Sequence, residues 1–207
     1  GGALFIPSDS QVPSQTRLTF DGAARQIKEA FYRNNVEQYR TTTTYGGDRV
    51  NVDPPNGATA VTTVSDARGR AVERREYIGG SPTGGYSATM YTHTSAGELA
   101  TVTDPAGNRW AYGYDLRGRK KSDRDPDKGL TVFDYDDADQ LIRSTDARGV
   151  VLAYSYDGLG RKTAIHDGSL TGFKRASWVY DTVPNGKGQL TSATRFVGSA
   201  AYVTEIT

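Results

Sequence analysis

Apolar and polar residues alternate along short segments of this chain, and many of the apolar members are aromatic. In the segment 109–114, Trp110, Tyr112 and Tyr114 occupy every second position. Side chains two residues apart lie on the same face of a β-strand, so the alternation predicts a strand with one aromatic face. Two later segments alternate in the same way, with Thr131, Phe133 and Tyr135 in one and Val150, Leu152, Tyr154 and Tyr156 in the other.

The alternating segments recur with a fixed period. Tyr114, Tyr135 and Tyr156 are spaced by 21 residues, and an Asp follows each of them. A fixed period of this length is the signature of a repeat protein, in which each unit packs against its neighbours. Other positions keep the same period: Tyr112, Phe133 and Tyr154; Asp115, Asp136 and Asp157; Asp104, Asp125, Asp146 and Asp167; Gly97, Gly118 and Gly160, with Asp139 in that position once.

Each unit contains two turns, such as Asp115-Leu116-Arg117-Gly118 and Asp104-Pro105-Ala106-Gly107. An Asp at the first turn position accepts hydrogen bonds from the backbone two residues on, and Gly at the last position tolerates a positive φ. The turns predict antiparallel hairpins, about 17 strands in all. At ~4.8 Å per strand the sheet would be about 80 Å wide. Twist should curl so wide a sheet into a spiral or an open arc, so the predicted fold class is all-β.

One segment leaves two readings open. Ile27, Ala30 and Phe31 have helical spacing within 23–40, but Asn34-Asn35 would interrupt a helix there. The strand–turn–strand interpretation is favoured because Thr41 to Thr44 continues as a β-type run. We expect one scaffold over 1–207, with divergent repeats at 1–85, regular repeats at 86–168 and looser repeats at 169–207.

The Tyr-Asp-x-x-Gly-Arg segments at 114–119 and 156–161, together with the turn at 104–107, resemble the YD repeats of Rhs (rearrangement hotspot) proteins. Similar repeats occur in the C components of insecticidal toxin complexes and in teneurins. The resemblance covers nearly the whole chain and is strongest from about 86 to 168. It implies a segment of a shell that encloses or presents a C-terminal toxin or effector of the parent protein. It also implies neighbouring YD repeats as partners, and a secreted or cell-surface bacterial protein.

A second function class is an adhesive module that binds carbohydrate or a cell surface, because exposed aromatic rows can stack on sugar rings. The direction of the aromatic columns distinguishes the two. Rings that face inward favour a container, and an exposed aromatic stripe with a groove favours glycan binding.

Charge and composition exclude several other classes. The net charge of +1, from 25 basic and 24 acidic residues, argues against a nucleic-acid partner, which needs a one-sided basic field. Cysteine is absent, so disulfides and cysteine-based chemistry are excluded. No apolar run approaches the length of a membrane span. The start Gly1-Gly2-Ala3-Leu4 lacks a Met and a signal pattern, so the chain is interpreted as an excised fragment.

The sequence predicts no catalytic residue, no cofactor and no metal ligand, so the chain is not expected to be an enzyme. His93 and His166 are the only histidines, and neither lies in a nucleophile motif. Asp104 and Asp125 resemble a paired aspartate motif of Rhs self-cleavage, but Asp146 and Asp167 hold the same repeat position. These aspartates are therefore interpreted as turn residues.

Two charged groups leave a binding role open. The acidic turn at 134–139 offers oxygen ligands of the kind that calcium prefers, although a solvated turn is the simpler interpretation. The basic clusters are expected to form cross-strand ion pairs, with an anionic ligand as the alternative. Their members are Arg68, Arg70, Arg74 and Arg75 in the first, and Arg117, Arg119, Lys120, Lys121 and Arg124 in the second.

Overall fold

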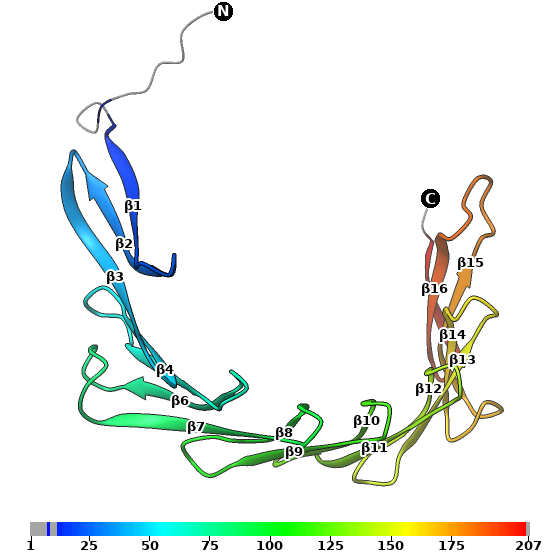
Figure 1. Cartoon of the computed structure of the whole chain (residues 1–207). Coiled ribbons are helices and arrows are strands. Elements are labelled where there is room, and N and C mark those ends of the chain that lie inside the picture. The colour runs from blue at the N-terminus through cyan, green and yellow to red at the C-terminus, as the bar shows by residue number, and fades with distance from the viewer. Residues whose placement is uncertain (1–7, 9–11, 206–207) are drawn as a thin grey trace, which may run out of the picture. The chain divides into compact units, whose positions relative to one another are not determined.

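The computed structural model describes residues 8 and 12–205, and every regular element within them is a β-strand (Figure 1). In this part of the chain no helix is long and apolar enough to cross a bilayer. The 17 strands confirm the predicted all-β class. They are β1 (Ser14–Phe20), β2 (Gln26–Arg33), β3 (Val36–Gly46), β4 (Arg49–Asp53), β5 (Val61–Ser65), β6 (Ala71–Tyr77), β7 (Tyr86–His93), β8 (Leu99–Thr103), β9 (Arg109–Tyr114), β10 (Lys120–Asp125), β11 (Gly129–Tyr135), β12 (Leu141–Thr145), β13 (Val151–Tyr156), β14 (Lys162–Asp167), β15 (Lys174–Tyr180), β16 (Leu190–Val197) and β17 (Ala200–Glu205).

Strands that follow one another in the chain pair antiparallel. Register pairs join each strand to the next from β1 to β7 and again from β9 to β17. The strands form one open sheet, as the hairpin pattern predicted. Two compact units divide it: a first unit that runs to Thr92 and includes Thr101–Asn108, and a second unit of His93–Ala100 and Arg109 onward. The curl of the sheet into a spiral or arc stays a prediction.

The segment for which a helix was the alternative forms a hairpin. β2 ends at Arg33 and β3 begins at Val36, and Asn34 and Asn35 between them have φ values of 48° and 63°. A two-residue connection with positive φ at both positions matches the right-handed twist of the flanking strands. Asn tolerates that conformation better than most residues, so the strand–turn–strand interpretation is confirmed.

A β-bulge follows each Tyr-Asp turn of the regular repeats. Tyr114 pairs with Lys120, but Gly113 pairs with Ser122, so Lys121 is an extra residue on β10. The same shift occurs where Tyr135 pairs with Leu141 and where Tyr156 pairs with Lys162. A bulge increases local twist and redirects side chains, and here it recurs at the same point of each unit.

In the second unit the aromatic columns share one face of the sheet. Residues directly opposite each other in an antiparallel ladder point to the same side, and an unbroken set of such pairs joins neighbouring strands. We call this side of the second unit its aromatic face. The pairs are Tyr112–Asp123, Asp123–Thr131, Phe133–Ser144, Ser144–Leu152, Tyr154–Ile165, Ile165–Ala176 and Trp178–Ala193.

The first unit does not keep all its rings on one side. Tyr45 lies opposite Val50, and the pairing continues through Thr63 to Arg74 on β6. Tyr77 is three residues from Arg74 on the same strand, so its ring lies on the other face of the sheet. There the centre of the Tyr77 ring lies 5.5 Å from the centre of the Tyr86 ring. A single aromatic side is therefore a property of the regular repeats, and the divergent repeats depart from it.

Little of the sheet is covered by other parts of the chain. Among the described residues the buried apolar side chains are Ala30, Ala60, Tyr77, Ala153 and Ala164. The accessible surface is 13712 Å², whereas a compact protein of this mass exposes about 9,400 Å². With so small a core, stability has to come mainly from the strand ladder and from contacts between neighbouring repeats.

Candidate functional site

The Tyr-Asp turns are the most regular polar feature of the chain. In the turn at 115–119, the Asp115 N–H donates to the Arg119 carbonyl and the Gly118 N–H donates to the Asp115 carbonyl, both at 3.0 Å. The Asp115 Oδ1 accepts from the N–H groups of Arg117 at 2.9 Å and Arg119 at 3.0 Å. Gly118 has a φ of 77°, which favours glycine. Asp21, Asp66, Asp136 and Asp157 accept the same two backbone bonds in their own turns.

The Arg at the end of the turn binds the same aspartate. The Arg119 Nε donates to Asp115 Oδ2 at 2.7 Å, and its side chain is 22% exposed. Arg161 makes the same bond to Asp157 at 2.7 Å. At Asp66, the Arg70 guanidinium and backbone N–H groups lower the pKa of the carboxyl to about 2. The Asp therefore remains ionised in the folded turn and fixes the Arg side chain.

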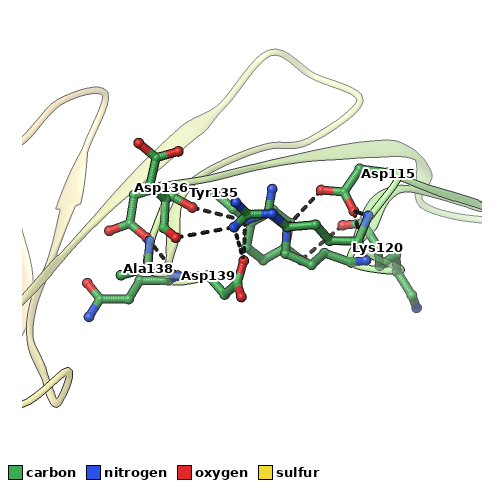
Figure 2. A network of polar contacts seen from close by, with 10 residues as sticks. Asp115, Lys120, Tyr135, Asp136, Ala138 and Asp139 are labelled. Carbon is green, nitrogen blue, oxygen red and sulfur yellow. Dashed lines mark hydrogen bonds and ion pairs between the residues drawn. The ribbon is translucent and has the colours of Figure 1, made fainter.

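From this position Arg119 contacts the next repeat, and Figure 2 shows Asp115 and Lys120 of one hairpin facing Tyr135, Asp136 and Asp139 of the next. Its Nη1 donates to the Asp136 carbonyl at 2.9 Å and to Asp139 Oδ1 at 2.7 Å. Its guanidinium carbon lies 4.9 Å from the centre of the Tyr135 ring, which is within cation–π range. The Tyr135 hydroxyl donates back to the Lys120 carbonyl at 2.9 Å. Neighbouring hairpins are thus joined by side chains as well as by the strand ladder.

We call this arrangement the Tyr-Asp-Arg clamp. An Arg that is bound to the turn Asp lies over the Tyr ring of the next repeat. The hydroxyl of that Tyr donates to the backbone carbonyl of the residue that follows the Arg. Arg25 and Arg161 each lie 4.3 Å from the ring centres of Tyr45 and Tyr180. The hydroxyls of these rings donate to the carbonyls of Gln26 at 3.2 Å and Lys162 at 3.0 Å.

The hydroxyl bond persists where the Arg is replaced. Tyr114 donates to the Leu99 carbonyl at 2.9 Å although Glu98 holds the Arg position. Tyr156 donates to the Leu141 carbonyl at 2.8 Å, after Gln140. The Tyr-to-carbonyl bond is therefore the constant part of the clamp, and the cation is an addition to it.

Acid should weaken the turn at 66–70, because the pKa of its aspartate is strongly lowered. The pKa of Asp66 is about 2 in the folded chain against an ordinary 3.8. A lowered folded pKa stabilises the fold above about pH 4, and this stabilisation is lost as the pH falls toward 2. We expect Arg70→Gln to lower the melting temperature (Tm) at pH 7 and to have much less effect at pH 2. Tm measured between pH 7 and 2 checks this, and an equal effect at both ends would contradict it.

The paired aspartates serve as turn residues. Asp104 accepts the Asn108 N–H at 2.8 Å and the Asn108 side-chain amide at 2.7 Å. Asp125 accepts the Asp127 and Lys128 N–H groups at 2.9 Å and the Trp110 indole N–H at 3.2 Å. Each aspartate closes its own turn, as the repeat position indicated.

The histidines and the residues of the acidic turn make local contacts within the fold. His166 Nδ1 lies 3.1 Å from the Gly172 carbonyl oxygen, and His93 ends β7. Asp136 caps its own turn, while Asp139 binds Arg117 and Arg119. Residues 12–205 hold no group of three or more His, Cys, Asp or Glu side chains placed to share a metal ion.

The basic clusters form ion pairs, but not with the geometry that was expected. Ion pairs between neighbouring strands were predicted. Instead, Arg70 binds Asp66 within one turn at 2.6 Å, and Arg75 binds Glu73 along one strand at 2.8 Å. Arg117 binds Asp139 of the next repeat at 2.9 Å. The bulges and turns bring these charges together, so strand register alone is a poor guide to their partners.

The fold and the clamps together define a class: an antiparallel β-repeat protein built from Tyr-Asp hairpins. Residues 93–129 and 135–169 match the family described as RHS Repeat. These two segments are therefore similar to RHS repeats, which confirms the resemblance to Rhs and YD-repeat proteins for this part of the chain. No curated protein sequence matches the chain.

Solved toxin-complex structures share the fold. The TcdB2-TccC3 crystal structure superposes with a TM-score of 0.70 at 17% identity over 87% of this chain. TcdB2-TccC3-Cdc42 gives 0.69 at 14% identity over 90% of this chain. The Photorhabdus luminescens Tc holotoxin pore with the TccC3-D651A mutation gives 0.64 at 15% identity over 87%. The chain spans 10–12% of the length of these structures.

Proposed function

We propose that this chain is a segment of a shell wall that encloses or presents a C-terminal toxin or effector polypeptide of a longer parent protein. The observation that carries the proposal is the clamp, repeated between neighbouring hairpins of a sheet that has almost no core of its own. Such a sheet is stabilised within its own plane, so both of its faces remain available. A wall needs this property, whereas a compact domain would cover at least one face.

We also propose that this segment catalyses no reaction and binds no cofactor or metal ion. The polar groups that recur most regularly in the chain are engaged in turns and clamps. Asp115, Asp136 and Asp157 each accept backbone hydrogen bonds that close a turn. An RHS-repeat wall would act through its shape and surfaces, in a secreted or cell-surface bacterial protein.

The clamp geometry favours the wall over a carbohydrate platform. A sugar-stacking ring needs an open face, but the rings of Tyr114, Tyr135 and Tyr156 are half-buried and their hydroxyls bond backbone carbonyls. Arg119 lies over the Tyr135 ring, where a sugar would have to stack.

Protease protection in the full-length parent protein tests the proposal. The segment that follows the repeats should be cleaved at least tenfold more slowly in the parent protein than as an isolated domain. A parent protein carrying Tyr135→Phe, Tyr156→Phe and Tyr180→Phe should lose part of this protection, because three hydroxyl bonds between hairpins are removed. Equal cleavage of the isolated and attached domain would contradict enclosure. Binding of the chain to a glycan array would support the adhesive alternative instead.

A further inference from the structure

The face of the second unit that lies opposite the aromatic face is basic. The register pairs Ala111–Arg124, Arg124–Leu130, Asp134–Arg143, Ala153–His166 and His166–Lys174 place these residues on that side. Arg109 joins them because it is two residues from Ala111 on β9. Without the extra bulge residues Lys121 and Arg175, the strands β9–β15 place four cations (Arg109, Arg124, Arg143, Lys174) and one carboxylate (Asp134) on this basic face, a net charge of +3.

The aromatic face of the same strands has the opposite balance. Lys120 and Lys162 stand against three carboxylates there, those of Asp123, Asp125 and Asp167, which gives −1. Strands β9–β15 of this near-neutral chain therefore separate their charges between two faces. The sequence count of 25 basic and 24 acidic residues concealed this separation.

The cations of the basic face also lack partners. The turn arginines Arg70, Arg119 and Arg161 each bind an aspartate. Within the described residues, in contrast, Arg109, Arg124, Arg143 and Lys174 take part in no ion pair and no side-chain hydrogen bond. All four are exposed. An unpaired, single-sign set of side chains on one face raises the affinity for an anionic surface.

We propose that the basic face of the second unit binds an acidic polypeptide, whose carboxylates pair with the cations of this face. Arg pairs with carboxylates in a bidentate geometry and is enriched at protein interfaces. Apolar side chains lie on the same face, among them Val132, which is 37% exposed, and Val179, which is 43% exposed. The spacing suits an extended acidic segment, since Arg143 and Lys174 lie three strands apart, about 14 Å at ~4.8 Å per strand.

Other anionic partners fit the face less well. Single-stranded nucleic acid is held by aromatic side chains on which bases stack, but Tyr112, Phe133 and Tyr154 lie on the other side of the sheet. Binding at a lipid surface uses large anchors such as Trp and Phe. The larger apolar residues between the cations are instead Leu130, Val132 and Val151, and none of them is aromatic.

A charge-neutralised variant with a matched control tests the inference. The face variant carries Arg124→Gln, Arg143→Gln and Lys174→Gln. The control carries Lys128→Gln, Arg148→Gln and Lys187→Gln, which removes the same charge from turns of the same unit. At low ionic strength we expect the unmodified chain to bind poly-L-glutamate, the face variant to bind at least tenfold more weakly, and the control to stay within about twofold. Matching circular dichroism spectra show that both variants are folded.

Three outcomes would overturn the inference: no binding of the unmodified chain to poly-L-glutamate, equal losses in both variants, or tighter binding to single-stranded DNA or phosphatidylserine vesicles that the face variant abolishes. The choice of a polypeptide as partner rests on the proposed function. The two can nevertheless fail separately, because protease protection is measured in the parent protein and poly-L-glutamate binding in this chain.

Discussion

Replacing Tyr135 with Ala is expected to destabilise the repeats on both sides of it by about 2–3 kcal/mol, somewhat less than the loss of a fully buried ring. The variant loses the half-buried ring, its contact with the Arg119 guanidinium and its hydroxyl bond to the Lys120 carbonyl. Tyr135→Phe removes only the hydroxyl bond and should cost about 1 kcal/mol. The difference between the two variants separates ring packing from hydrogen bonding.

Hydrogen exchange is the suitable measurement, because repeat proteins open by units rather than all at once. In Tyr135→Ala, the exchange rates of the β10 and β11 amides should rise above those of the unmodified chain by more than the rates of the β15 and β16 amides do. Tyr202→Ala serves as the control, since its side chain is 63% exposed on β17. If Tyr135→Ala and Tyr202→Ala changed exchange to the same extent, the clamp would not hold the repeats together.

The second large effect is expected at Gly172, in the connection between β14 and β15. A Cβ at this position would overlap the carbonyl oxygen of Asp167, a backbone atom that cannot move aside alone. The connection is held by bonds from the Asp167 N–H to the Phe173 carbonyl and from the Gly168 N–H to the Val151 carbonyl, both at 2.9 Å. Gly172→Ala must therefore break or rebuild this segment.

We expect Gly172→Ala to lower stability by about 3 kcal/mol, which corresponds to a Tm about 6–12 °C lower for a chain of this size. Gly158→Ala is the matched control, because a Cβ there meets no atom within 4 Å. Thermal melting of both variants checks the prediction. A Tm for Gly172→Ala within 2 °C of that for Gly158→Ala would show that the connection has a different conformation.

Much of the fold could be predicted because it depends on local chemistry. Aspartate at a turn start and Gly at its end specify the turn between Asp115 and Gly118 without help from distant residues, and period-two alternation specifies the strands. Likewise, Asn34-Asn35 argued against a helix in 23–40, and the β-type run from Thr41 to Thr44 favoured the hairpin. These local signals are sufficient to predict the all-β class of the protein without any contact between repeats.

The clamp and the basic face could not be predicted because both depend on register. The bulge at Lys121 shifts the pairing by one residue, and a shift of one residue exchanges the two faces of a strand. The contact of Arg119 with Tyr135, 16 residues later, requires the next hairpin to be in place. In hindsight the Arg four residues after each turn Asp, at Arg25, Arg119 and Arg161, was the available signal.

The central claim is that the aromatic columns of the second unit lie on one face of a ladder in which successive strands pair directly. The chain has no cysteine, so engineered cysteine pairs report this register without background. Asp123→Cys with Thr131→Cys, and Ser144→Cys with Leu152→Cys, join directly opposite positions and should form disulfides rapidly under mild oxidation. The shifted pairs Asp123→Cys with Val132→Cys and Ser144→Cys with Ala153→Cys should not. Faster disulfide formation in the shifted pairs would contradict the account.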